Sequence, residues 1–109
     1  MFVPIVPPKE LPKAFALFQN FPNPFNPETW IPYQLAEATF VDIRIYDSQG
    51  RLVRQIPLGK KDAGYYTTKE TAAHWDGRDN LGQVVASDVY FYQLKAGDFM
   101  KMRKMVIVK

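Results

Sequence analysis

The sequence predicts an all-β protein, an antiparallel sandwich of about seven strands. Apolar and polar side chains alternate with a period of two in residues 29–35, 41–46 and 89–94, which is the pattern of half-buried strands. Turn-forming residues separate these stretches, so that short strands recur about every ten residues. The chain has 109 residues, 47% of them hydrophobic, and no cysteine. It can therefore form one domain with a substantial core and without disulfides.

The N-terminal part predicts a linker followed by a single domain. Residues 1–13 hold Pro4, Pro7, Pro8 and Pro12, a composition that favours an extended, semi-rigid chain. We expect the folded domain to span residues 14–109.

Residues 18–29 have the most unusual composition in the chain, with three prolines, three asparagines and three phenylalanines in the order FQNFPNPFNPET. Each proline fixes its own φ and keeps the residue before it extended, while asparagine side chains can bond to nearby backbone in Asx-turns. This segment, called the strap below, is predicted to be rigid and irregular.

The first regular strand is expected at residues 29–35. It places Ile31, Tyr33 and Leu35 on one face. Pro32 cannot donate a hydrogen bond to a neighbouring strand. This strand is therefore predicted to lie at an edge of the sheet, or to have the nitrogen of Pro32 facing away from the neighbouring strand.

The next element is predicted to be a hairpin. The stretch 41–46 places three β-branched side chains inward, and residues 47–50 suit a type I turn that ends in a left-handed Gly50. The chain should therefore reverse into a strand at residues 51–56.

The remaining elements follow from turn residues and β-branched or aromatic content. We expect a loop at residues 57–64, a strand at 65–69, a short helical turn at 69–74 and a tight reversal at 74–83. A strand should follow at 89–96, with Tyr90, Tyr92 and Leu94 on one face. After a turn at 97–98, the closing strand is expected at 100–108.

Charge and hydropathy exclude two classes of partner. The net charge is +3, from 14 basic and 11 acidic residues spread along the chain, which is too diffuse for nucleic-acid binding. The apolar runs fall far short of the ~20 residues that span a bilayer, and the N-terminus lacks a secretory signal pattern. If the domain is exported, its signal peptide is expected upstream in a longer parent.

Catalysis and metal binding have few candidate residues. The single histidine, His74, and the acids Asp76 and Asp79 fall in a predicted turn rather than across a cleft, so we expect no enzyme activity. Asp76, Asp79 and Asn80 offer hard oxygen ligands that could hold calcium. The alternative, which we favour, is that Asp76 and Asn80 cap turns through their own backbone, in which case no cofactor is needed.

Two sets of residues are candidates for partner binding. Trp30 lies on the face opposite Ile31 and could anchor a partner, unless linker residues 2–13 fold over it. Basic residues gather near the C-terminus, at Lys101, Arg103, Lys104 and Lys109. They could form the solvated outer face of the last strand, or contact an anionic surface polysaccharide or a secretion component.

Several separated motifs carry a family resemblance. They are residues 19–29, 45–54, 63–64, 75–79, 89–92, 96–99 and 104–105. In these blocks the chain resembles the C-terminal sorting domains of secreted bacterial proteins handled by the type IX (Por) secretion pathway, and the related immunoglobulin-like domain of the flagellar hook-capping protein. The likeness covers residues 14–109.

The resemblance implies an immunoglobulin-like sandwich at the C-terminus of a larger exported protein. It further implies a non-catalytic module that directs secretion or cell-surface attachment, with the secretion machinery or a surface anchor and an upstream passenger domain as partners. Two alternatives remain at this point. One is a flagellar hook-cap-like assembly domain, and the other is a carbohydrate-binding module that uses Trp30, Tyr46 and Tyr65.

Overall fold

Nine antiparallel strands and no helix make up residues 10–109, the part of the chain that the computed structural model describes. The first nine residues of the predicted linker lie outside this part. The strands are β1 (Ala16–Leu17), β2 (Thr29–Ile31), β3 (Tyr33–Leu35), β4 (Thr39–Tyr46), β5 (Leu52–Lys61), β6 (Gly64–Tyr66), β7 (Ala73–Trp75), β8 (Asp88–Ala96) and β9 (Phe99–Ile107). The predicted all-β fold is confirmed.

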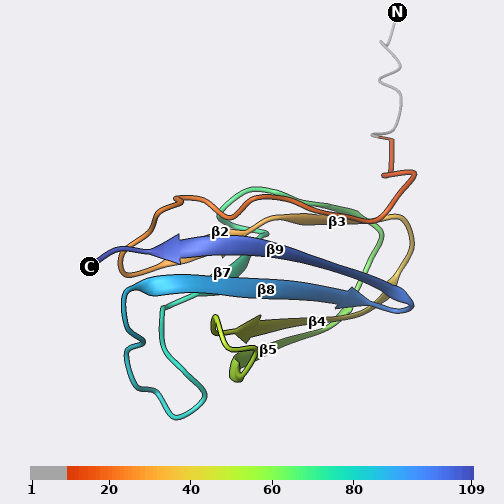
Figure 1. Ribbon diagram of the computed structural model, residues 1–109. Helices are drawn as coiled ribbons and strands as arrows, with labels where there is room; N and C mark the ends of the chain where they lie inside the picture. The colour runs from red at the N-terminus through yellow and green to blue at the C-terminus, as the bar shows by residue number, and fades with distance from the viewer. Residues whose placement is uncertain (1–9) are drawn as a thin grey trace, which may run out of the picture.

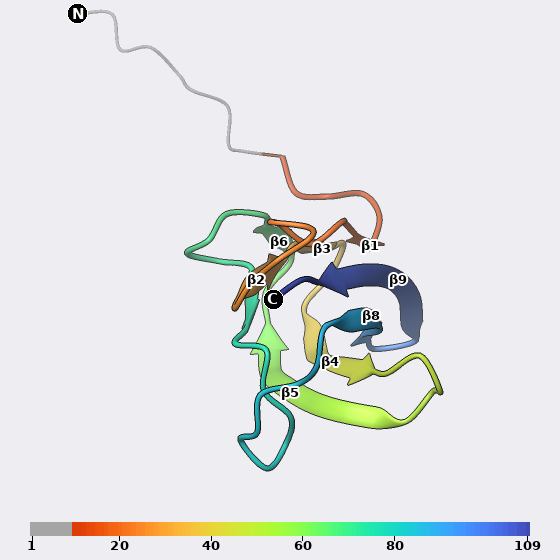
Figure 2. The ribbon, with the colours of Figure 1, turned by 60° about the vertical axis from the view of Figure 1, so that its left-hand side comes forward.

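The strands form two layers that face each other across the core (Figure 1). One layer is a four-stranded sheet in the order β5-β4-β8-β9. The other layer consists of the short sheets β1-β3-β6 and β2-β7. Figure 2 shows the four long strands curving beneath the layer of short strands. The arrangement is an immunoglobulin-like sandwich.

The core lies between the layers and contains the side chains that the alternation placed inward. Its fully enclosed members, each 0% exposed, are Ile31, Tyr33, Leu35, Ile43, Ile45, Trp75, Tyr92, Leu94, Ala96 and Met105. Val41 is 2% exposed and Tyr90 is 5% exposed. The prediction of which side chains point inward is therefore confirmed for all three alternating stretches.

The strand predicted at residues 29–35 is divided at Pro32. β2 pairs with β7, whereas β3 lies between β1 and β6. The carbonyl of Pro32 accepts a hydrogen bond of 3.0 Å from the N–H of Phe18. Because proline supplies no N–H to a neighbouring strand, the chain changes partners there without losing a backbone bond.

The prediction of a loop at residues 57–64 is wrong, because β5 continues to Lys61 and pairs with β4 along its length. The N–H of Gln55 points away from β4, toward Asn80. Pro57, two residues further along this edge strand, has the same orientation, so its missing N–H costs no bond in the sheet. A bulge follows, and there Gly59 has a φ of 75°.

The region between β5 and the reversal also differs from its prediction. The strand expected at residues 65–69 is limited to β6, and the helical turn is confined to residues 68–71, where Ala72 N–H donates to the Thr68 carbonyl at 2.7 Å. Ala73–Trp75 then form β7, which the sequence did not predict. Three residues are too few to show a recognisable alternation.

The turn between β4 and β5 forms as predicted. Gly50 has a φ of 81°, and its N–H donates to the Asp47 carbonyl at 3.0 Å. The Asp47 carboxylate accepts the N–H of Arg51 and of Gln49, each at 2.9 Å. The hydrogen bond from the Arg51 backbone, followed by other local contacts, lowers the pKa of Asp47.

Replacing Gly50 with valine is expected to destabilise the protein by about 1–2 kcal/mol, because a β-branched residue is strained at positive φ. No atom lies within 4 Å of the added Cβ, so the effect would be one of backbone strain. Chemical denaturation measures it. Gly64→Ala is the control, since Gly64 is not at positive φ, and an equal loss in both variants would refute the explanation.

Two buried tyrosines differ in how their hydroxyls are satisfied. Tyr92 accepts a hydrogen bond from Asn20 N–H at 2.9 Å and donates one to the Phe18 carbonyl at 2.7 Å. The hydroxyl of Tyr33 has no hydrogen-bond partner among residues 10–109, and its ring stacks on Tyr66 with centroids 4.8 Å apart. Burial raises the pKa of Tyr92 to about 12 and also raises the pKa of Tyr33.

Substitution by phenylalanine should therefore have opposite effects at the two sites. Tyr92→Phe is expected to cost about 2 kcal/mol because it removes two buried hydrogen bonds, while Tyr33→Phe is expected to be neutral or to stabilise by up to about 1 kcal/mol. Urea denaturation of the two variants checks this pair. A comparable loss at both positions would contradict it.

The raised pKa values add a dependence on pH. An unfolded tyrosine ionises near pH 10, whereas folded Tyr92 stays neutral up to a pKa of about 12. The unfolded state thus releases protons first, and the free energy of unfolding falls as pH rises above about 10. Tyr92→Phe is expected to show a smaller fall over this window.

Candidate functional site

The strap lies along β9, the edge strand of the four-stranded sheet. Phe25 N–H donates to the Val106 carbonyl at 3.0 Å, and Val108 N–H donates to the Phe25 carbonyl at 3.1 Å. The Asn23 side-chain oxygen accepts Val106 N–H at 3.0 Å, and the Gln19 amide donates to the Lys104 carbonyl at 3.0 Å. We call this set of contacts the seam. It covers an edge that would otherwise present unpaired backbone groups.

Asn20 connects the strap to the core through Tyr92 and also bonds to other residues of the strap. It is only 2% exposed, and its amide nitrogen donates to Thr29 Oγ1 at 3.0 Å and to the Pro22 carbonyl at 3.2 Å. Its backbone N–H donates to the hydroxyl of Tyr92. Burying a polar side chain costs little free energy when its donors have hydrogen-bond partners. These bonds explain why an asparagine can be buried at this position.

Phe25 inserts its ring into the core at the far end of the strap. The side chain is 2% exposed and meets the ring of Trp75 edge-on, with centroids 5.6 Å apart. The next turn of the strap contacts Gly77, where an added Cβ would lie 2.5 Å from the Pro27 carbonyl oxygen. The strap is thus fixed at both ends and along the seam.

Trp30 lies on the outer face of β2, as predicted, but its ring is half-buried by its neighbours. The Phe21 ring is 6.3 Å away, the His74 ring is 5.2 Å away, and Lys69 Nζ lies 4.4 Å from the ring centroid. The cover thus comes from the strap, β7 and the turn at 68–71. Linker residues 2–13 were the cover that the sequence left open as an alternative, and residues 2–9 of them lie outside the described part.

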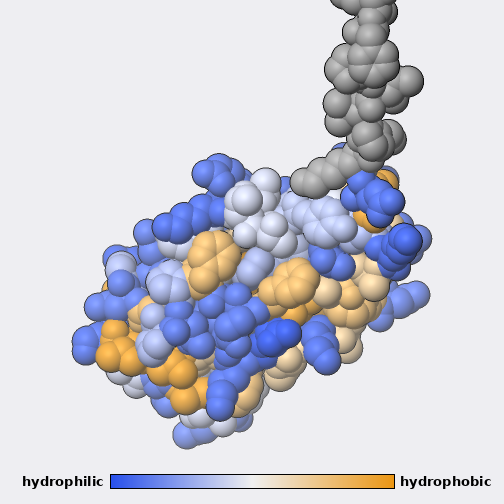
Figure 3. Space-filling view, turned by 90° about the horizontal axis from the view of Figure 1, so that it is seen from above, coloured by the Kyte–Doolittle hydropathy of each residue, from blue (hydrophilic) through white to orange (hydrophobic). Residues whose placement is uncertain are grey.

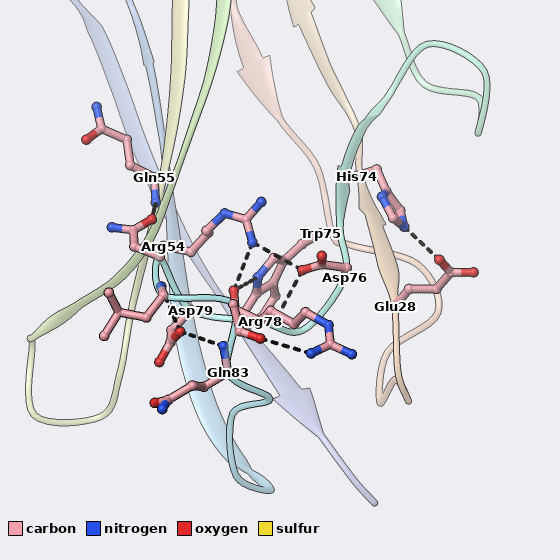
Figure 4. A network of polar contacts seen from close by, with 12 residues as sticks. Glu28, Arg54, Gln55, His74, Trp75, Asp76, Arg78, Asp79 and Gln83 are labelled. Atoms are coloured by element: carbon pink, nitrogen blue, oxygen red, sulfur yellow. Dashed lines mark hydrogen bonds and ion pairs between the residues drawn. The ribbon is translucent and has the colours of Figure 1, made fainter.

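His74 also forms a pair that sequence reasoning missed. Its Nε2 lies 2.7 Å from Glu28 Oε2, which becomes an ion pair when the imidazole is protonated. Both side chains are nearly half exposed, at 45% and 46%, and they stand apart from the loop contacts in Figure 4. Sequence separation hid the pair, because only the pairing of β2 with β7 brings these residues together.

The basic C-terminal residues do not form the single outer face that was predicted. Register places Lys101 opposite Leu94 and Arg103 opposite Tyr92, so both side chains leave β9 on the side of the other layer. Arg103 Nε donates to the Leu17 carbonyl at 2.7 Å. Lys104 points to the outer face, and the ammonium of Lys109 donates to the Val85 carbonyl.

The oxygens considered for calcium accept backbone hydrogen bonds in the loop after β7 (Figure 4). Asp76 accepts Arg78 N–H at 3.0 Å and Arg54 Nη1 at 3.2 Å. Asp79 accepts the N–H of Leu81 and of Gln83, each at 2.9 Å. Asn80 accepts Gln55 N–H at 3.0 Å. The backbone bonds of Asp76 and Asp79 are those of turn-capping side chains. The predicted capping role of Asn80 is wrong, because its oxygen accepts an N–H of β5, 25 residues away, and so holds the loop to that strand.

The carboxylates do not converge on a common point. Within residues 10–109, no group of three or more histidine, aspartate or glutamate side chains has the proximity needed to hold a metal ion. The same part of the chain includes no helix that is long and apolar enough to cross a membrane.

Calcium at millimolar concentration is expected to leave the melting temperature unchanged, because binding to the native state alone would raise it and the loop oxygens are engaged with backbone donors. Differential scanning calorimetry with calcium and with magnesium measures this. A rise of several degrees with calcium only, absent in Asp76→Asn with Asp79→Asn, would instead support a calcium site.

The aromatic residues considered for carbohydrate binding lie on different layers. Trp30 belongs to β2 and Tyr65 to β6, in the layer of short strands, whereas Tyr46 belongs to β4 in the four-stranded sheet. The three side chains therefore cannot form one row along a sugar chain.

Comparison with known proteins gives one family match. The model of the FlgD Ig-like domain family matches residues 26–98. No curated protein sequence matches the chain.

Solved structures share the fold, among them two Por proteins and FlgD. Dimeric latent PorU from Porphyromonas gingivalis has a TM-score of 0.67 at 20% identity over 87% of this chain, and PorZ of the same organism has 0.55 at 21% over 86%. FlgD from P. aeruginosa has a TM-score of 0.52 at 24% identity over 67% of this chain. The matched regions are 9% of the PorU chain, 12% of the PorZ chain and 54% of the FlgD chain.

Proposed function

The chain belongs to the family of FlgD Ig-like domains, and from that premise we propose that it is a non-catalytic module that directs the secretion or cell-surface attachment of a larger exported bacterial protein. Its partners in this role are the secretion machinery or a surface anchor, and a passenger domain upstream in the same polypeptide. Its place of action is the cell surface or the medium.

The seam between the strap and β9 is the observation that carries this proposal. The Asn-Pro signature of residues 19–29 and the closing strand are far apart in sequence, yet four hydrogen bonds join them into one rigid unit. A transporter can therefore read both from one surface. Folded recognition surfaces of this kind need no reaction of their own.

Similarity to solved structures adds support. PorZ is described as an essential bacterial surface component of the type-IX secretion system, and its fold covers 86% of this chain. PorU covers a similar share, 87%. Both matches extend further along the chain than the match to FlgD, which covers 67%.

A hook-cap-like assembly domain is the second candidate. The family model favours this role. So does the extent of the structural matches, because the match covers 54% of the FlgD chain but only 9% of the PorU chain. In that role the same sandwich would contact other subunits of an assembly instead of a transporter.

An export assay separates the two candidates. Residues 1–109 are joined to the C-terminus of an inert periplasmic reporter in a bacterium that has the type IX pathway, and the reporter is measured at the cell surface and in the periplasm. We expect the fusion to reach the surface, and the reporter alone to remain periplasmic. A fusion that is folded, as judged by protease resistance, yet stays periplasmic would refute the sorting role and favour assembly.

A further inference from the structure

The outer face of the four-stranded sheet carries more exposed apolar surface than a solvated sheet face requires. The alternation that buries Val41 and its inward neighbours turns the intervening residues outward. Four of the outward side chains are large and apolar: Phe40 is 71% exposed, Met100 57%, Leu52 47% and Met102 47%. Half-buried Tyr46 and Phe91 form one row with Leu52 and lie next to Met102. Phe40 lies at the opposite end of the sheet, beyond Arg44 and Asp42. Exposed apolar side chains that gather on one face mark interaction sites.

Two hollows open on this face. One is lined in part by Phe40, Pro57 and Lys95. The other is lined in part by Tyr46, Phe91 and Met102. The opposite layer looks different, because Figure 3, viewed from the side of the strap, shows apolar side chains in separate areas bordered by hydrophilic ones.

Two acidic residues lie on or beside the outer face, and both are paired. Asp47, which lines the second hollow, forms an ion pair with Arg51 at 2.8 Å. Asp42 is the only acidic residue at an outward position of the four strands. Its carboxylate already accepts Arg44 Nε at 3.0 Å and the Gln55 amide at 3.1 Å. Lys60, Lys95 and Lys104 also point outward, and no ion pair involves any of them within the described part of the chain. The face therefore combines exposed apolar side chains with lysines that have no ion pair among residues 10–109, and Arg44, Gln55 and Gln93 also point outward among them.

We propose that this outer face, centred on Met100 and Met102 and bordered by Lys95 and Lys104, is the docking surface for a protein of the export machinery that presents an acidic and apolar patch. The inference rests on the proposed sorting function and adds, beside the seam, a second surface that the export machinery contacts. Charge complementarity selects the partner, and desolvated apolar side chains at the centre supply most of the affinity.

Other occupants fit the face less well. A second copy of the chain would bring like-charged lysines together, which opposes association. An anionic polysaccharide would satisfy the lysines but would leave Phe40, Met100 and Met102 without an apolar partner.

Surface variants in the export assay test the inference. One variant reverses charge with Lys95→Glu and Lys104→Glu, and another removes apolar contacts with Met100→Ser and Met102→Ser. All four side chains are exposed, so thermal unfolding of the purified variants should match wild type. The control, Lys13→Glu with Lys61→Glu, makes the same charge change at two positions that do not belong to this face.

We expect each face variant to lower the surface-exposed fraction of the fusion about tenfold, as the loss of a small number of interface anchors does, and the control to behave as wild type. If wild-type fusion is exported and the face variants are exported equally well, the docking surface is wrong while the sorting function stands. If the wild-type fusion itself stays in the periplasm, the sorting function fails first.

Cross-linking identifies what covers the face. A photoreactive amino acid in place of Met102 is irradiated in exporting cells, with the same substitution of Glu70 on the opposite layer as control. We expect an adduct with an envelope protein at position 102 and none at 70. An adduct between two copies of the fusion, an adduct with polysaccharide, or equal adducts at both positions would overturn the proposal.

Discussion

A chain that ends at Arg103 is expected to be unfolded. Deleting residues 104–109 removes Met105 and Ile107, which are 0% and 3% exposed in the core. Losing one such side chain costs about 2–5 kcal/mol. The deletion also removes every β9 backbone group that bonds to the strap in the seam. Together these losses reach the whole stability of a small domain, which is about 5–15 kcal/mol.

A chain that ends at Ile107 is the matched control. It keeps both core side chains and three of the four seam hydrogen bonds, and loses the one from Val108 N–H to the Phe25 carbonyl. Circular dichroism and thermal unfolding should show a folded protein for the shorter deletion and none for the longer one. A cooperative transition in the chain ending at Arg103 would show that β9 is dispensable for folding.

This result has a consequence for export experiments. A C-terminal truncation that abolishes secretion would be explained by unfolding alone, without any loss of a recognised signal. The substitutions at Lys95, Lys104, Met100 and Met102 avoid this ambiguity because those side chains are exposed.

The long strands could be predicted from the sequence because periodic burial determines them. Val41, Tyr92 and their neighbours alternate over enough residues for the inward face to be identified. Short elements could not be predicted in the same way. β7 has three residues, and β2 is separated from β3 by a proline whose effect depends on which strands lie alongside.

The candidate site was predicted only where the interactions are local. The predicted capping role agrees with the bond from Arg78 N–H to Asp76, two residues away. It fails for Asn80, whose oxygen accepts Gln55 N–H from a strand 25 residues away. The direction of Lys101 and Arg103 depends on the register with β8, which alternation of charged and apolar residues did not fix. The seam and the pair of Glu28 with His74 depend on contacts between distant segments.

Phe25→Ala is expected to cost about 3–5 kcal/mol, as other fully buried phenylalanines do when truncated. Its ring is 2% exposed and packs edge-on against Trp75, which in turn meets Tyr90 edge-on at 5.8 Å. The cavity would lie between the strap and the core, at the point where the Phe25 backbone bonds to β9. Both sides of the seam should therefore loosen.

Amide hydrogen exchange locates that loosening. The N–H groups of Val106 and Val108 donate to the strap. In Phe25→Ala these two amides should exchange through local opening, faster than global unfolding allows, whereas amides in the centre of β8 should still exchange only by global unfolding. Phe21→Ala is the matched control, because Phe21 is a strap phenylalanine that is half-buried beside Trp30; it should cost less and leave both amides protected. Seam amides that exchange as slowly in Phe25→Ala as in the wild type would show that backbone bonds alone hold the strap. The buried ring would then contribute to stability without positioning the strap.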